Sequence, residues 1–341
     1  MPGAALIEVP VGPEAVERFR ADLERLTGGS PQPDAALGIA VSGGSDSLAL
    51  LLLARAAWPG LVAAATVDHG LRDEAAAEAR YVGEICAGLG IPHATLRLPE
   101  PRPAIANVQE RARVIRYRCL ASWAQSQRIA FVATAHQRDD VAESFLMRAV
   151  RGAGVRSLAS MPDTRLLDNA AALLVRPLLG WTRAELGAIV KVAGLDPVAD
   201  PSNADPRFDR ARMRTLLAEN PKLPPEQLAR AATNLRDVEE AIEWMVLRDL
   251  DRLEQRSDGT VLLNADGLPF ELKRRFILRA IETVRRRQGL LDPWRATAVA
   301  DLGRSLDRGS GGTVADVEAR VRGDRWHFRP APPRRRTATK G

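Results

Sequence analysis

Three observations predict an α/β protein in which a doubly wound parallel sheet is followed by a smaller, mostly helical domain. Up to about residue 180, short apolar runs typical of buried strands alternate with longer helical patterns, as in βαβ units. Beyond that point strand-like runs become rare. The 341 residues also exceed the usual length of one domain, so we expect a first domain over 1–204, a second over 205–330 and a disordered basic tail over 331–341.

The first domain contains five predicted strands with four predicted helices between them. The strands are expected at 37–41, 61–67, 93–98, 129–134 and 172–176, and the helices at 46–57, 73–89, 107–126 and 139–150. Ligands of parallel sheets bind beyond the carboxyl ends of the strands. We therefore expect three segments that follow strands to lie at one rim of the sheet: 42–47, 67–72 and 135–140.

The remaining chain is predicted to be largely helical. Thr182, with Glu185 three residues later, forms a capping box that predicts a helix over 181–193. The segment 196–210 is rich in Pro and Asp and is predicted to be a loop. Further helices are predicted at 210–219, 225–256, 266–288 and 293–307, and the alternating segment 311–330 predicts a small hairpin.

Charge is distributed unevenly along the chain. The net charge of +6 divides into −1 for residues 1–204 and +7 for residues 205–341, where most of the excess is Arg. Such a bias fits either a polyanionic partner or a solubilising surface. No apolar run approaches the ~20 residues of a membrane span, and two distant cysteines, Cys86 and Cys119, form neither a disulfide framework nor a metal-binding spacing. We expect a soluble, cytoplasmic protein without a signal peptide or a membrane segment.

The segment SGGSDS, residues 42–47, lies between the first predicted strand and the first predicted helix. Its hydroxyls and glycines allow close approach to an anion at a helix N-terminus: Ser42, Gly43, Gly44, Ser45 and Ser47. It lacks the Lys of a Walker A loop. Asp46 would repel phosphate unless Mg²⁺ lay between them. Local features are equally compatible with a phosphate-binding loop and with a simple helix cap.

This loop, in its strand–loop–helix context, resembles the pyrophosphate loop of the N-type ATP pyrophosphatases. Further stretches, in this order and spacing, resemble the shorter form of the tRNA(Ile)-lysidine synthetases: VDHGLR (67–72), NVQERARVIRYRCL (107–120), TAHQRDDVAESFLMRAVRGAG (134–154), RPLLGWTRAELGAIV (176–190) and DPSNADPRFDRARMR (200–214). The resemblance covers residues 37 to about 214 well. The sequence departs from the family pattern at Gln137, where a second His is common, and at Ala211, where Asn is common.

The resemblance implies a PP-loop ATP pyrophosphatase domain that modifies tRNA. The wobble cytidine of an isoleucine tRNA with a CAU anticodon would be adenylated by ATP at its carbon 2 oxygen, with release of pyrophosphate. The amine of free L-lysine would then attack carbon 2, and AMP would leave. ATP and Mg²⁺ are the implied co-substrate and cofactor, and the basic domain 205–330 is the expected tRNA-contacting part.

Three carboxylates at the start of the helix 139–150 are the strongest further candidates. Asp139 and Glu143 share a helix face with Asp140 beside it. Such a cluster needs a cation, for which Mg²⁺ and a lysine ammonium are suitable; a solvated acidic helix start is the alternative. We assign Asp140 and Glu143 to lysine, Asp46 and Asp139 to metal, and all four to catalysis.

The other candidate residues are assigned by their position at the rim and by the resemblance. ATP binding is expected from the loop 42–47 together with His69 and His136, and Arg72 belongs to the same rim. Contacts with tRNA are expected from six arginines: Arg113, Arg116, Arg151, Arg210, Arg212 and Arg214. Basic residues at 273–275, 279 and 285–287 are the second candidates for tRNA contact, with a solvated helix face as the alternative.

Two other functions compete with this prediction. A tRNA 2-thiocytidine-type enzyme shares the loop, but its chemistry is associated with Cys-x-x-Cys pairs that hold an iron–sulfur cluster, which two isolated cysteines cannot supply. A non-catalytic, nucleotide-binding regulator would need the loop but not the acidic helix. The sequence leaves the oligomeric state, including a homodimer, open.

Overall fold

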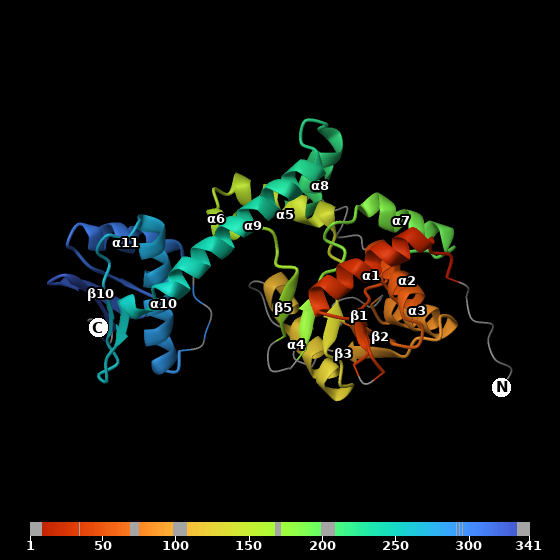
Figure 1. The fold of residues 1–341 in the computed structure, drawn as a ribbon, viewed down its shortest axis with the longest axis horizontal. Helices are drawn as coiled ribbons and strands as arrows, with labels where there is room; N and C mark the ends of the chain where they lie inside the picture. Colours follow the sequence, from red (N-terminus) through yellow and green to blue (C-terminus); the bar gives the residue numbers. More distant parts are fainter. Residues whose placement is uncertain are drawn as a thin grey trace, which may run out of the picture. The chain divides into compact units, whose positions relative to one another are not determined.

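The computed structural model describes residues 9–33, 35–68, 75–97, 108–167, 172–198, 209–290, 292, 294 and 296–332. The chain divides into two compact units, Met1–Arg236 and Asp237–Gly341, each of which is described by itself (Figure 1). The division falls within α9 (Pro225–Arg248) and not after residue 204, because α8 (Asp209–Glu219) packs on α5 (Arg138–Val150) of the first unit. Residues 333–341 of the predicted tail lie outside the described part of the chain.

The first unit is built on a six-stranded sheet with the order β3-β2-β1-β4-β6-β5. Five strands run parallel: β1 (Leu37–Ala40), β2 (Val62–Asp68), β3 (His93–Arg97), β4 (Phe131–Ala133) and β6 (Leu173–Val175). The edge strand β5 (Thr164–Leu166) runs antiparallel to β6. This order confirms the predicted doubly wound sheet and reverses between β1 and β4, which is where such sheets bind ligands.

Helices cover both faces of this sheet. One apolar cluster joins the sheet to α1 (Pro13–Thr27), α2 (Ser45–Ala57), α3 (Ala75–Gly88) and α7 (Arg183–Val192), and another joins it to α4 (Val108–Ser126). All residues from 48 to 54 of α2 are buried. Its continuous apolar run, which has no polar stripe, therefore reflects a central helix that is surrounded by protein. A short helix, α6 (Val155–Leu158), follows α5.

The second unit combines helices with a five-stranded antiparallel sheet in the order β7-β8-β11-β10-β9. Its elements are η2 (Leu250–Arg252), β7 (Leu253–Gln255), β8 (Val261–Leu263), α10 (Phe270–Arg287), η3 (Ala296–Ala298), α11 (Val299–Asp307), β9 (Gly312–Val314), β10 (Val317–Arg322) and β11 (Arg325–Pro330). The hairpin predicted at 311–330 is part of this larger sheet, and the helix predicted to reach 256 ends at Arg248.

One face of the second sheet is buried and the other is exposed. Phe276 and Ile281 of α10 and Leu302 of α11 pack with Val317 and Phe328 of the strands in a single core cluster. The opposite face carries charged side chains, most of them exposed. No described helix of either unit combines the length and the apolar character that a membrane span requires.

Candidate active site

The SGGSDS segment forms a tight loop between β1 and α2. The Ser47 hydroxyl donates to the Gly44 carbonyl at 2.8 Å and accepts from the Ser42 amide at 3.2 Å. Gly44 is the N-cap of α2 and has no side chain with which to cap it. The first amide groups of α2 are therefore directed at the space beyond β1, where a phosphate can accept from them.

Gly43 is required by both its conformation and its surroundings. Its φ angle is +84°, in the left-handed region that favours glycine, and a Cβ there would come within 2.9 Å of Cγ2 of Val198. The Gly43 carbonyl also accepts from the Val198 amide at 2.9 Å. The loop is thus held from behind by the segment that follows α7, which leaves its amide side for a ligand.

Asp46 lies in the first turn of α2, and one of its carboxylate oxygens lacks a hydrogen bond. Its Oδ1 is buried and has no hydrogen-bond partner among the described residues. Burial, followed by the negative charge of Asp140, raises the pKa of Asp46 to about 6, against an opposing effect of Arg183. This carboxylate can gain a cation or a proton without giving up an existing hydrogen bond at Oδ1.

The segment after β4 starts α5 with a capping box. Gln137 is buried and is the N-cap: its Oε1 accepts from the Asp139 amide at 2.6 Å, and its backbone N–H donates to Oδ2 of Asp140 at 3.2 Å. Asp139 in turn accepts from the backbone amide of Arg183, the first residue of α7, at 3.1 Å. Asp139 therefore ties the start of α5 to the start of α7.

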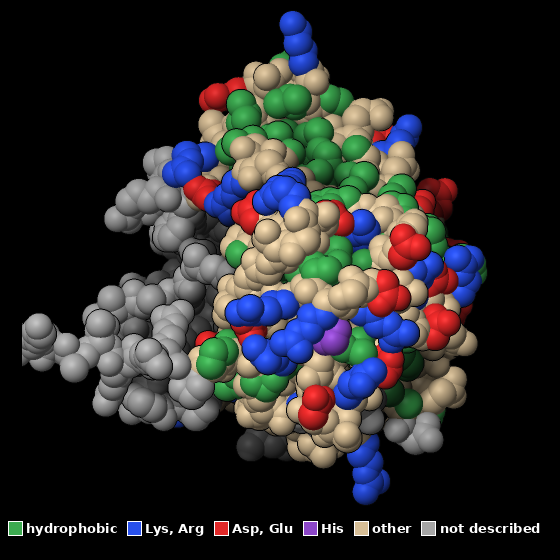
Figure 2. All heavy atoms as spheres, turned by 90° about the vertical axis from the view of Figure 1, so that its left-hand side faces the viewer, with side chains coloured by type: hydrophobic (Ala, Val, Ile, Leu, Met, Phe, Trp, Pro, Cys, Tyr) green, Lys and Arg blue, Asp and Glu red, His purple; other side chains and the backbone are tan. Residues whose placement is uncertain are grey.

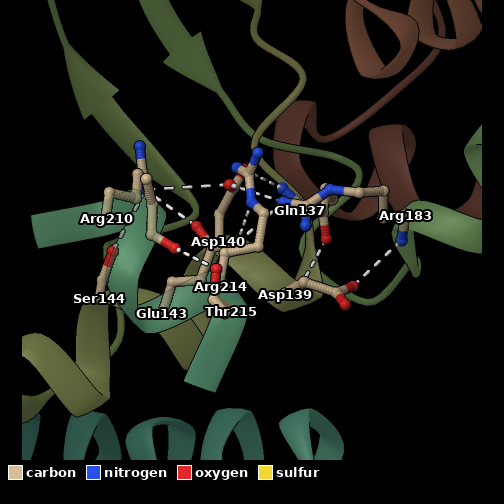
Figure 3. Close-up of polar contacts among 10 residues, drawn as sticks. Gln137, Asp139, Asp140, Glu143, Ser144, Arg183, Arg210, Arg214 and Thr215 are labelled. Atoms are coloured by element: carbon tan, nitrogen blue, oxygen red, sulfur yellow. Dashed lines mark hydrogen bonds and ion pairs between the residues drawn. The ribbon is translucent and has the colours of Figure 1, made fainter. Parts of the chain in front are cut away.

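Glu143 is fully buried and lies among three arginines, here called the arginine cluster: Arg183, Arg210 and Arg214 (Figure 3). Its Oε1 accepts from Arg183 at 3.0 Å and from Arg214 at 3.0 Å, and its Oε2 lies 3.2 Å from Nε of Arg210. A carboxylate at this depth is tolerated because it is paired from several sides.

Asp140 has weaker cationic contacts than Glu143. Its Oδ1 lies 3.6 Å from Arg183 and 3.8 Å from Arg210, and 13% of its side chain is exposed. Burial raises the pKa of Asp140, and the charge of Arg210 opposes that rise. Asp140 thus has a greater capacity than Glu143 to take a further cation.

The structure brings the predicted loop and the predicted carboxylates to the ends of the two central strands. His136 follows β4, where its Nδ1 lies 3.1 Å from Oγ1 of Thr134. His69 and Arg72 lie outside the described residues, and Arg113 is described only as part of the α4 backbone. Arg116 is exposed on the same helix.

The predicted tRNA contacts divide into two groups. Arg151 and Arg212 are exposed and both pair with Asp209 at the start of α8. Arg210 and Arg214 instead contact Glu143, so the face of α8 that they share is directed toward α5. Their predicted role as phosphate contacts stays a prediction.

Arg183 is the site residue that sequence reasoning missed. It contacts Asp139 through its backbone and Glu143 through its guanidinium, which joins α7 to the carboxylates of α5. A signal was present: Arg183 begins the helix that follows the strand predicted at 172–176, so it belongs to the same rim as the other candidates.

The donors at this site fit a magnesium ion shared with a nucleotide. Mg²⁺ is usually held by one or two carboxylates together with substrate phosphates. Within the described ranges, no group of three or more His, Cys, Asp or Glu side chains could hold a metal alone. The oxygen of Asp46 without a hydrogen-bond partner, beside the SGGSDS loop, suits such a shared ion, whereas Asp139 already accepts from the amide of Arg183.

Comparisons with known proteins agree with this geometry. The PP-loop domain family matches residues 16–220. A tRNA(Ile)-lysidine synthase of Zymomonas mobilis is 43% identical over 303 residues, which are 88% of this chain and 90% of that protein. A tRNA(Ile)-lysidine synthase of Novosphingobium aromaticivorans is 41% identical over 326 residues, covering 94% and 95% of the two chains.

Among solved structures, the fold is similar to that of the U34-tRNA thiolase NcsA from Methanococcus maripaludis. The TM-score is 0.53 with 19% identity, over 65% of this chain and 78% of that one. At this identity the likeness concerns the fold alone.

Proposed function

The chain belongs to the PP-loop proteins and, among them, to the tRNA(Ile)-lysidine synthases, and from this premise we propose that it is a ligase that uses ATP to form lysidine on an isoleucine tRNA. The observation that carries the proposal is the meeting of two elements at the switch point of the sheet: the SGGSDS loop after β1 and the carboxylates of α5 after β4. The loop fits a pyrophosphate group, and the carboxylates fit a cationic amine.

In the first half-reaction, the carbon 2 oxygen of the wobble cytidine in a CAU anticodon attacks the α-phosphate of ATP. Pyrophosphate leaves, and negative charge grows on it. The amides at the start of α2 and the hydroxyls of the loop stabilise that charge where it develops. Asp46 would hold Mg²⁺, which when bound neutralises phosphate charge. His136 lies at the same rim and is proposed to contact the nucleotide.

In the second half-reaction, the side-chain amine of free lysine attacks carbon 2 of the adenylated base, and AMP leaves. The ammonium of lysine must first lose a proton. We assign Asp140 to hold this ammonium and to accept the proton, because burial raises its pKa and its contacts with arginine are long. Glu143 takes part through its charge and by ordering the arginine cluster around Asp140.

The remaining expectations concern the nucleic acid and the location of the reaction. Exposed arginines of the first unit, Arg116, Arg151 and Arg212, are proposed to contact phosphates of the tRNA, together with Arg113. Since ATP, free lysine and tRNA occur together in the cytoplasm, we place the reaction there.

The proposal is tested by incubating the protein with ATP, Mg²⁺, labelled lysine and tRNA transcripts. Label should enter an isoleucine transcript with a CAU anticodon and should not enter the methionine transcript with the same anticodon. AMP and pyrophosphate should be released in step with the label. Absence of label from both transcripts would refute the function.

A further inference from the structure

The arginines of the second unit divide into a group that is used inside the unit and a group that is presented outward. On α10, the buried Arg275 pairs with Glu239, and Arg279 pairs with Glu243. The buried Arg285 lies 2.9 Å from Asp292. Most of the α10 arginines that the sequence made candidates for tRNA contact are therefore engaged in contacts within the protein.

The strands present their basic residues on the opposite side. Along β10 and β11, buried residues such as Ala319 and Phe328 face the helices, while their neighbours in sequence face outward. We call these outward residues, together with Arg256 directly after β7, the basic face: Arg256, Arg320, Arg322, Arg325, His327 and Arg329. These residues line a hollow of about 350 Å³ together with Asp258, Thr260, Leu262, Glu318 and Asp324.

The strand register places like charges opposite each other on this face. Arg322 of β10 is paired with Arg325 of β11. Like charges directly opposite on a sheet are destabilising. Arg325 has an exposed ion pair with Glu254 at 2.5 Å, whereas Arg322 forms no ion pair with any described residue. The positive charges of Arg322 and Arg325 are thus less fully balanced by carboxylates than those of the arginines of α10.

Two other observations support a locally positive field. Burial lowers the pKa of His327, and the charges of Arg322, Arg256 and Arg325 lower it further. On the side of the unit seen in Figure 2, Lys and Arg side chains gather around a histidine.

Glu318 accepts from Arg320 at 2.6 Å and from Arg329 at 2.7 Å, which holds two guanidinium groups in place on the surface.

We propose that the basic face, on the outer side of the second sheet, binds the phosphate backbone of the tRNA substrate. The inference rests on the proposed function, since that function makes a polyanion the partner. A row of arginines on an exposed sheet fits phosphates because each guanidinium can donate to two phosphate oxygens. A strand pair carries these groups at fixed spacing, so several successive phosphates can be contacted at once. Such contacts position a nucleic acid without reading its bases.

The test measures tRNA binding by the full chain without ATP or lysine, over a series of salt concentrations. The double variant Arg322→Ala/Arg325→Ala should raise the Kd for tRNA several-fold and should lower the slope of log K against log salt by about 1 for each arginine. A matched control, Arg304→Ala/Arg308→Ala, removes two exposed arginines of the same unit that do not line the hollow. The control should bind like the wild type.

Two additional measurements separate binding from folding. The double variant Arg322→Lys/Arg325→Lys should keep the wild-type slope, because it keeps both charges. Without tRNA, the Ala/Ala variant should melt at or above the wild-type temperature, since it relieves the opposed charges. Wild-type Kd and slope in the Ala/Ala variant, or an equal loss in the control, would overturn the proposal. Lysidine formation by the wild type is measured separately, so a failure of the proposed function remains distinguishable.

Discussion

The Asp46 carboxylate has a pKa of about 6 because it is largely buried and faces Asp140. In the unfolded chain an Asp titrates near 3.9. Above pH 6 the Asp46 carboxylate is ionised in both states, but ionisation is less favourable in the folded protein than in the unfolded chain. The charge of Asp46 therefore lowers the free energy of unfolding. A cation bound at Asp46 would reverse that effect, which is what a site built for a metal–nucleotide complex requires.

The variant Asp46→Asn should therefore be more stable than the wild type at pH 7.5 without nucleotide and Mg²⁺. The expected gain is on the order of 1–3 kcal/mol, from about two pKa units. The gain should shrink as the pH falls through 6 and should vanish below 4, where the wild-type carboxylate is protonated in both states. Urea unfolding at several pH values measures this. The same variant should lose lysidine formation, and a loss of stability at pH 7.5 would contradict the assignment.

Asp140 and Glu143 are both acidic and near each other, yet they should respond differently to substitution. Asp140→Asn should leave ATP binding and tRNA binding nearly intact while turnover falls by roughly 10²-fold or more. Equilibrium binding and single-turnover assays measure the two effects. Asp301→Asn, at an exposed carboxylate of the second unit, is the matched control. Unchanged turnover in Asp140→Asn would refute the catalytic role assigned to Asp140.

Glu143→Ala should mainly destabilise the protein. Removing one partner of a fully buried ion pair costs about 3–5 kcal/mol. Here the arginine cluster is a third or more exposed and can recover water, so we expect a cost of roughly 2–3 kcal/mol. Chemical denaturation measures the change, and Glu143→Gln, which keeps the hydrogen-bond acceptor Oε1, should cost less. Equal stability of Glu143→Ala and the wild type would show that the cluster does not stabilise α8 on α5.

At the scale of elements, α7 is attached to the active site through its first turn. Thr182 accepts from the Glu185 amide at 3.0 Å, and its own amide donates to Glu185 at 2.7 Å, which completes the predicted capping box. The next residue, Arg183, is the one that contacts Asp139 and Glu143. The cap therefore sets the position of a residue that holds two carboxylates.

Thr182→Ala should destabilise the protein by about 1 kcal/mol, the usual cost of a lost N-cap. It should also raise the KM for lysine, because Arg183 then holds Asp139 and Glu143 less rigidly. Thr182→Ser keeps the hydroxyl and should restore both properties. Thermal melting and steady-state kinetics on the two variants measure both effects. Identical behaviour of the Ala and Ser variants would show that the Thr182 hydroxyl determines neither the stability nor the KM for lysine.

The elements of the first unit were largely predictable, because alternating strands and helices of ordinary length carry strong periodicity. Three-residue strands such as β7 and β8 are too short to show a period, so the second sheet was recognised only in part. Helix α1 was missed although Pro13 in its first turn and Gly28 as its left-handed cap mark its ends. The contacts of Glu143 lie 40 and 71 residues away in sequence, and no local spacing reveals such a pairing.

At the scale of the whole molecule, the charge bias of the sequence has a measurable consequence. Residues 205–341 carry a net charge of +7, and residues 1–204 carry −1. Contacts between Arg and phosphate release counterions, so tRNA binding should weaken steeply with salt. In the proposed site, ATP would be held mainly by backbone amides and hydroxyls of a small loop, and salt screens such contacts much less.

Raising the salt from 50 to 200 mM should therefore raise the KM for tRNA by about tenfold or more, while the KM for ATP changes little. Steady-state kinetics with one substrate varied at a time measures both. A parallel rise of the two constants would point to a general effect of salt on the fold. A salt-independent KM for tRNA would show that contacts with phosphates are not the basis of tRNA binding.

Gln137 has a consequence beyond its hydrogen bonds. At the position where the resembled family commonly has a second histidine, this chain starts α5 with an amide that is fully buried. An imidazole there could gain a proton between pH 5 and 8 and would then lose the lone pair that accepts from the helix. The amide of Gln137 has no proton to gain in that range. The N-cap of the acidic helix therefore keeps its hydrogen bond to the Asp139 amide throughout this pH range.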